Sequence, residues 1–276
     1  MNRVFAFVAA LLVISCMALP GFADEAAQYV ESLNLRRKSA GLQAVVLDEA
    51  LSRACTAHAK YLAVNCEEHT KRGKAMSIEE KDLPGYSKEG AAAAAKAFVH
   101  LREPLDALNF TLARASTRHA VLMPHLKRIG VGFATGGPQG FVTVLDKDSG
   151  LKGKLTEIFV YPGEGQTDVP LQMEVDNPNP VPQDPDGSAG YPVSVFFPQG
   201  TGIKDVSATM KDSAGVVVEV WLSSPDTHPK DMPWPSSILV IARDKLQPKT
   251  PYTVTVTGKV GGKPWKRAWT FTTGEK

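Results

Sequence analysis

The feature that most constrains this chain is a change of composition about halfway along it. From Asp24 to Arg118 the sequence is rich in alanine and leucine at helical spacing, whereas beyond Tyr161 it is rich in proline, glycine, valine and threonine. The segment DKDSGLKGK, 146–154, is polar and contains glycine, as is typical of a linker. We therefore expect an α+β chain with two domains, a helix-rich one over 24–150 and an all-β one over 155–276.

The first 23 residues have the pattern of an export signal. Arg3 precedes an apolar run over residues 4–19, and small residues of the kind that a signal peptidase reads follow it. The run is short for a membrane span, and no later segment is apolar enough to be one. We expect cleavage near Ala23 and a secreted or periplasmic protein. Alternatively, Cys16 in VISC resembles the lipobox of bacterial lipoproteins and would become a lipid anchor.

Charge and cysteine content exclude several classes of protein. The 31 basic and 29 acidic residues are scattered, so nothing resembles the basic stripe of a nucleic-acid binder. Only Cys55 and Cys66 remain after signal removal, too few for a disulfide-rich fold. A straight helix would separate them by about 16 Å. We expect two separate thiols, unless the helix ends early and the chain folds back.

Periodicity predicts four helices and two strands in the first half. Asp48 is a good N-cap for the second helix, on which Cys55 and His58 share one face with two leucines. His58 should therefore point inward as a hydrogen-bonded core residue. The alanines that open the third helix should pack closely against another element. The expected helices are 24–40, 48–64, one from 91 and 105–122, and the expected strands are 128–134 and 141–146.

The second half has the pattern of a β-sandwich. Alternation is clearest around Tyr252, Val254 and Val256, whose side chains take one face while threonines take the other. Six short strands separated by turn residues predict a sandwich of immunoglobulin type. The expected strands are 192–197, 206–210, 216–222, 238–242, 251–257 and 265–272.

No complete catalytic motif is present. The sequence contains no Walker loop, dinucleotide fingerprint, GxSxG elbow or HExxH. Two histidines could still do chemistry: His69 in the polar loop CEEHTKRG, and His119 at the end of the fourth helix, where the helix dipole alone could account for it. Neither has a partner at metal-ligand spacing, so spacing alone indicates zinc only weakly.

Two motifs in the first half resemble the CAP superfamily, which includes the cysteine-rich secretory, antigen 5 and pathogenesis-related-1 proteins. The first is LNLRRKSAGLQAVVLDEALSRACTAHAKYL, which resembles the opening pair of helices. The second is SxxH, here Ser116 to His119, followed by a proline and IGVG. The resemblance covers roughly 27–146 and is closest to bacterial single-domain members.

The resemblance implies an α-β-α sandwich with a cleft that holds two histidines and two acids and binds zinc in some members. Matched by position, His119 and His69 are the histidines, and the neighbouring Ser116 belongs to the same cleft motif. Glu89 occupies the place of the first acid. Glu80, Glu79 and Glu103 are alternatives for the second acid.

The chain departs from the bacterial pattern next to these positions, with Ala113 where tryptophan is usual and Ala120 where arginine is common.

The second half resembles bacterial Ig-like modules through LxPxTxYxVxV and WxFxT. In such modules Tyr252 would be a tyrosine corner, its hydroxyl bonded to the backbone upstream.

We therefore expect an exported, non-enzymatic protein whose CAP-like cleft binds a small-molecule, peptide or cell-envelope ligand while the Ig-like domain spaces or attaches it. One alternative is a zinc-dependent hydrolase, which a complete set of two histidines and two acids in a pocket would favour. Another is lipid or sterol binding, which needs an apolar groove.

Overall fold

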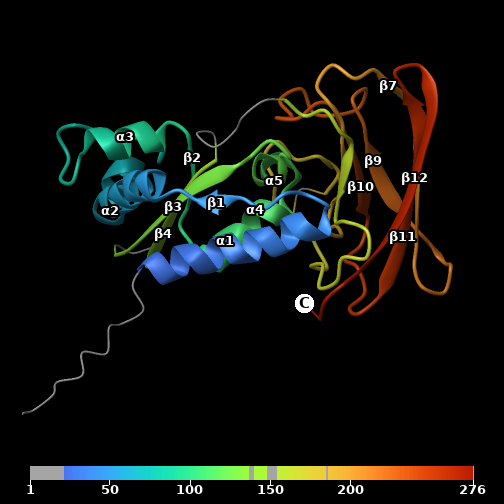
Figure 1. Cartoon of the computed structure of the whole chain (residues 1–276), viewed down its shortest axis with the longest axis horizontal. Coiled ribbons are helices and arrows are strands. Elements are labelled where there is room, and N and C mark those ends of the chain that lie inside the picture. Colours follow the sequence, from blue (N-terminus) through green and yellow to red (C-terminus); the bar gives the residue numbers. More distant parts are fainter. Residues whose placement is uncertain (1–21, 137–139, 148–153, 185, 276) are drawn as a thin grey trace, which may run out of the picture.

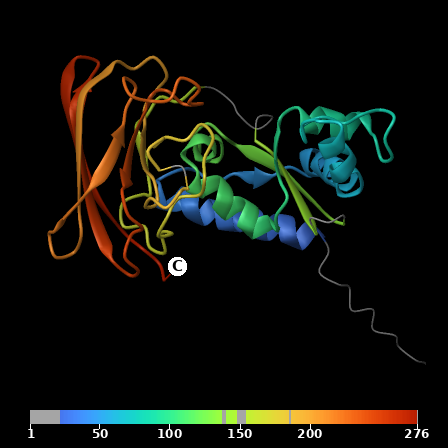
Figure 2. The same ribbon diagram turned by 180° about the vertical axis from the view of Figure 1, so that it is seen from behind.

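The computed structural model describes residues 22–136, 140–147, 154–184 and 186–275. This part of the chain is α+β, as expected, with five helices and three four-stranded sheets. Figures 1 and 2 show the helical half and the sheets of the second half from opposite sides. The predicted export signal, Cys16 and the middle of the predicted linker lie outside the described residues.

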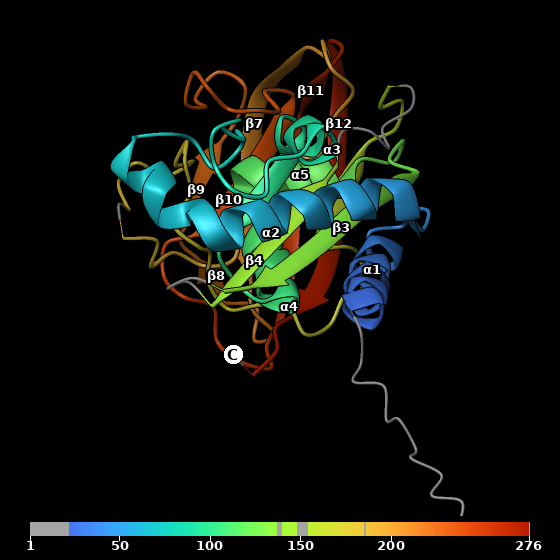
Figure 3. The ribbon, with the colours of Figure 1, turned by 90° about the vertical axis from the view of Figure 1, so that its left-hand side faces the viewer.

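The first half is a four-stranded sheet with helices on both faces. Its strand order is β1-β3-β4-β2, and β1 pairs with β3 in parallel while the other pairs are antiparallel. Helices α2 and α3 cover one face, and α1, α4 and α5 cover the other (Figures 1 and 3). The elements are α1 (Phe22–Ser39), β1 (Val46–Leu47), α2 (Glu49–Lys71), α3 (Lys88–Ala94), β2 (Ala97–His100), α4 (Pro104–Ala113), α5 (Ala115–Leu122), β3 (Arg128–Thr135) and β4 (Phe141–Asp146).

The alternation of β3 explains how both faces are filled. Ile129, Val131 and Phe133 are buried against α1, α4 and α5, because successive strand residues point to opposite faces. The intervening Gly130 and Gly132 face α2. A Cβ atom on Gly132 would lie 2.1 Å from the backbone nitrogen of Thr56, so glycine is what lets the helix rest directly on the strand.

Three helices differ from the sequence prediction. Helix α3 spans Lys88–Ala94, so the alanines expected to open it form its end. Helix α2 begins after Asp48 as expected, with the Asp48 side chain accepting from the backbone N–H of Leu51, but it continues to Lys71. The helix expected over 105–122 is interrupted, because Arg114 has extended backbone angles, φ −104° and ψ 126°. Its guanidinium reaches Asp176 in the second half of the chain. The helical pattern on both sides of Arg114 could not reveal this long-range partner.

The second half consists of two antiparallel sheets, ordered β5-β6-β10-β9 and β12-β11-β7-β8. Tyr252, Val254 and Val256 are buried, and the Tyr252 hydroxyl accepts from the backbone N–H of Gln247, the bond expected of a tyrosine corner. Strand β5 was not predicted. The bounds are β5 (Phe159–Tyr161), β6 (Val193–Phe196), β7 (Ile203–Lys211), β8 (Val217–Val218), β9 (Val220–Ser223), β10 (Ser237–Ala242), β11 (Pro251–Val260) and β12 (Lys263–Thr272).

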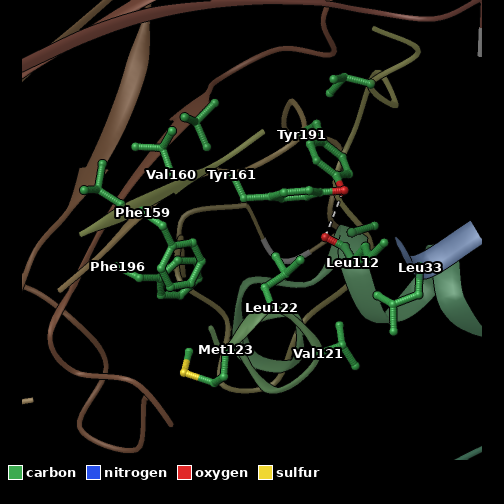
Figure 4. Close-up of a cluster of buried hydrophobic side chains, with 14 of the residues drawn as sticks. Leu33, Leu112, Val121, Leu122, Met123, Phe159, Val160, Tyr161, Tyr191 and Phe196 are labelled. Atoms are coloured by element: carbon green, nitrogen blue, oxygen red, sulfur yellow. Dashed lines mark hydrogen bonds between the residues drawn. The ribbon is translucent and has the colours of Figure 1, made fainter. Parts of the chain in front are cut away.

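The two halves share one hydrophobic core. A single cluster of buried side chains runs from Tyr29 and Leu33 of α1 through Leu122 of α5 to Phe159 and Phe196 of the second half. Figure 4 shows Leu33, Leu122, Phe159 and Phe196 of this cluster. The domain division at 150–155 stays a prediction, to be tested against this continuous packing.

Candidate functional site

Helix α2 carries a buried polar cluster, made by His58, Tyr61, Asn65, His69 and Glu79. Its side chains bind the segment 74–87 to the helix. The His58 Nε2 lies 2.8 Å from the Met76 carbonyl oxygen, and its Nδ1 lies 3.0 Å from Oε1 of Glu79. The carbonyl can only accept, so Nε2 carries a proton. The bond between Nδ1 and Oε1 needs a second proton, carried either by Nδ1 or by the carboxyl group. His58 and Glu79 therefore share this second proton.

His69 lies at the other end of this cluster. The Tyr61 hydroxyl accepts from the backbone N–H of Glu80 at 2.8 Å, so its own proton is available to Nε2 of His69 at 2.7 Å. Nδ1 of His69 then carries the ring proton, 3.3 Å from the carbonyl oxygen of Ala75. The sequence placed His69 in a loop, and this was wrong: it lies in the last turns of α2 and is 0% exposed.

The same cluster fixes the start of α3. Oε2 of Glu79 accepts from the backbone N–H of Ser87, the N-cap of α3, and Asn65 donates to the carbonyl oxygens of Tyr61 and Pro84. The acids that the resemblance singled out lie differently. Glu79 is in the cluster, Glu80 forms an ion pair with Lys74 at 3.3 Å, and Glu89 is exposed on the first turn of α3.

Helix α5 carries the second predicted motif and faces the second half of the chain. Ser116 is buried, and both its hydroxyl and its backbone N–H donate to the carboxylate of Asp176. The Asp176 carboxylate is fully buried and also pairs with Arg114, at 3.2 Å. Ser116 is therefore part of the contact between the halves.

The neighbouring residues of α5 continue this contact. His119 lies against the ring of Trp234, with ring centroids 6.0 Å apart. Arg118 is 0% exposed, donates to the carbonyl oxygens of Leu112 and Pro192, and places its guanidinium 4.6 Å from the ring centroid of Tyr191. His69 and His119 thus have different surroundings, on helices that cover opposite faces of the sheet.

The chemistry of these residues fits a metal poorly. No group of three or more His, Cys, Asp or Glu within the described ranges could hold a metal ion. Zinc at His69 would have to displace Tyr61 or Ala75 from the ring nitrogens. Cys55 and Cys66 are buried free thiols, as expected. Burial raises the pKa of Cys55 to about 12 and that of Cys66 above its ordinary value, which makes both poor ligands and nucleophiles.

A hollow of about 260 Å³ lies at the junction of the two halves. Helices α1 and α4 form one side of it, and the backbone around β5 and 166–170 forms the other. Its wall combines the rings of Tyr161 and Tyr191 with charged and amide side chains. Figure 4 shows the two rings next to Leu112, whose carbonyl oxygen accepts from the Tyr191 hydroxyl at 2.9 Å.

Sequence reasoning missed three residues that organise these regions. Tyr61, Arg118 and Asp176 are buried polar side chains whose bonds join separate parts of the chain. Tyr61 could have been found, because it shares a helical face with His58 and Leu62. Nothing near Asp176, which lies in a proline-rich loop, indicates its partners 60 residues earlier.

One comparison with known proteins finds a match in the first half of the chain. Residues 30–146 match the model of CAP, the cysteine-rich secretory protein family. No curated protein matches the chain. A solved DUF4426 family protein from Pseudomonas aeruginosa is similar over 32% of this chain and 68% of its own, with 13% identity and a TM-score of 0.25, too low for an argument about fold or function.

Proposed function

Given the CAP domain at residues 30–146, we propose that this protein is an exported, non-enzymatic ligand-binding protein. It works in the periplasm or outside the cell, either free after cleavage near Ala23 or anchored through Cys16. Its ligand is a small molecule or peptide of the cell envelope or its surroundings. The second half acts as an Ig-like spacer or attachment module. Within the described residues, no helix is long and apolar enough to cross a membrane.

The observation that carries this proposal is how the two histidines of α2 and the nearby Glu79 are bonded. Both ring nitrogens of His58 and of His69 have partners inside the protein, and both side chains are 0% exposed. A general base or metal ligand must reach substrate or metal. These rings instead hold 74–87 against α2, which favours a structural role for them and binding rather than hydrolysis for the domain.

The junction hollow is the site that this proposal assigns to the ligand. It is formed by both halves, and ligand sites occur preferentially at domain interfaces. Its volume, about 260 Å³, suits a small ligand. Bonds from Ser116 and Arg118 of α5 to the second half connect the two halves that form it.

The proposal is tested by the thermal stability of the mature protein with a panel of amino acids, dipeptides and sugars. A ligand that binds the native state raises the melting temperature, and the increase grows with the ratio of the ligand concentration to Kd. Substitution of Asn109 by tryptophan, which fills the hollow from the exposed surface of α4, should abolish the shift. Zinc titration by calorimetry should show no saturable site. Saturable zinc binding with zinc-dependent ester or peptide hydrolysis would instead support the hydrolase alternative.

A second candidate, lipid or sterol binding, is favoured by two hollows beside β1, one lined mainly by α1 and the other mainly by α2. They measure about 570 and 590 Å³, and Leu47 of β1 lines both. The exposed apolar side chains of Leu35 and Val46, 57% and 63% exposed, belong to the same region. Binding of a fluorescent fatty acid or sterol that Leu47→Asp abolishes and Asn109→Trp leaves intact would select this candidate.

A further inference from the structure

The junction hollow carries charged groups of both signs, one from each half of the chain. Arg36 of α1 and Asp168 of the second half both line it. Within the part of the chain that the structure describes, neither has an ion-pair partner. Asp168 has a hydrogen bond to the Thr167 hydroxyl at 3.3 Å. The hollow thus offers one cation and one anion, contributed by different halves.

Gln166 adds a donor that nothing in the described chain uses. It is 8% exposed, and its Oε1 accepts from the backbone N–H of Gly163 at 2.9 Å, which fixes the orientation of the amide. Oε1 also lies 2.9 Å from the Ser39 hydroxyl. No described residue accepts a hydrogen bond from its Nε2. A nearly buried amide left with N–H groups to donate, beside a hollow that also contains Arg36, is suited to an anionic group.

The size of the hollow limits what it can hold. A sphere of 260 Å³ is about 8 Å across, and two residues of extended chain span about 7 Å. The remaining wall includes Leu112 and Pro170, which suit small apolar side chains. A polymer or a large cofactor is too big for this site, and a single inorganic ion would leave one of the two charges unused.

We infer that the junction hollow binds a small zwitterion of the amino-acid or dipeptide class. Its carboxylate lies against Arg36 and the Gln166 amide, and its ammonium group lies against Asp168. This inference rests on the proposed ligand-binding function and specifies its ligand. The two charges come from separate halves, so a bound zwitterion joins them, and neither half alone has the complete site.

The test uses L-alanyl-L-alanine as the probe and isothermal titration calorimetry of the full mature chain. We expect saturable binding that weakens at least about tenfold when the probe is N-acetylated or C-amidated, because each change removes a charge-assisted hydrogen bond. Arg36→Gln and Asp168→Asn should each have a similar effect. Arg53→Gln, at a side chain 74% exposed on α2, is the matched control and should leave binding unchanged.

Folding defects are separated from lost contacts by a second variant. Asp168 has φ of 55°, a conformation that glycine adopts without strain, so Asp168→Gly removes the carboxylate and keeps the backbone. It should lose binding while keeping the melting temperature within a few degrees. Equal binding of capped and free dipeptides, or binding that neither Arg36→Gln nor Asp168→Gly affects, would overturn the inference.

The proposed function can survive that result. If a neutral or singly charged compound binds and Asn109→Trp blocks it, the hollow is a ligand site of another class, and only the zwitterion inference fails. If neither the dipeptide nor any compound of the panel binds at the hollow, both this inference and the assignment of the ligand to the junction are wrong.

Discussion

Helices α2 and α5 both carry side chains that the resemblance to the CAP superfamily assigned to one cleft. The hydrogen-bond partners of these side chains lie in different parts of the chain. His58, Asn65 and His69 of α2 find partners 6 to 21 residues away, in the segment that follows the helix. On α5, Ser116 and Arg118 also find partners 60 to 76 residues away, across the junction. The resemblance thus does not predict the partners of these side chains, which depend on what else the chain contains.

The largest expected effect comes from separating the halves. Expressed apart, 24–150 and 155–276 should each melt cooperatively but well below the intact chain, because the shared core around Leu122 and Phe196 becomes exposed. Mixed together, they should associate in sedimentation. If neither half melts cooperatively, the domain division is wrong and the junction is part of a single folding unit.

The next largest effect is expected for Asp176→Ala, which removes the buried partner of Arg114 and Ser116. Breaking a buried charge pair from one side costs roughly 3–5 kcal/mol, and we expect this loss in the free energy of unfolding measured with urea. Asp186→Ala, on the exposed part of the same loop, should change it little. A cost of less than about 1 kcal/mol for Asp176→Ala would mean that the α5 contact contributes little to the junction.

The pH dependence of stability should reveal a histidine of the first half. Burial, with the positive charges of Arg114 and Arg102 nearby, lowers the pKa of His100 to about 4. The unfolded chain, with a histidine pKa of about 6.5, binds more protons between these values. The free energy of unfolding should therefore fall as pH drops from about 6.5 to about 4, by about 3 kcal/mol in total.

The matched variant is His100→Gln, which keeps a donor near the Thr111 hydroxyl but does not titrate. In this variant the free energy of unfolding should depend less on pH between about 4 and 6.5, because the contribution of His100 is removed. His228 of the second half has a pKa lowered by burial as well, so some slope of the same sign should remain. An unchanged slope in His100→Gln would assign the effect to the other histidines whose pKa burial lowers, His125 of the first half and His228.

The smallest effect should be local to α2. Tyr61→Phe removes the hydroxyl between His69 and the Glu80 N–H, and leaving buried polar groups without partners costs about 1–3 kcal/mol. Because those partners lie close in sequence, amide hydrogen exchange should speed up over 74–87 while the second half stays protected. Tyr86→Phe is the control. Faster exchange throughout would show that the cluster supports the whole fold.

Sequence reasoning predicted the elements that periodicity controls and missed those fixed by distant contacts. The N-cap at Asp48, the inward face with His58 and the alternation through Tyr252 were confirmed because each depends on neighbouring residues. Strands β1, β2 and β5 have only two to four residues, too few to show a period. The break at Arg114 and the burial of Ser116 depend on Asp176, whose position relative to α5 exists only in the folded chain.

The buried Arg118 has a consequence for the order of events during biosynthesis. Its acceptors at Pro192 and Ser194 are synthesised more than 70 residues after it. Until these acceptors emerge, burying the guanidinium group of Arg118 would cost free energy, because the charged group would lose its hydrogen bonds to water without replacement. We therefore expect the last helix of the first half to remain undocked on a nascent chain that ends before residue 192. Arrested chains of increasing length, probed by pulse proteolysis, should gain protection of α5 only when the second half follows.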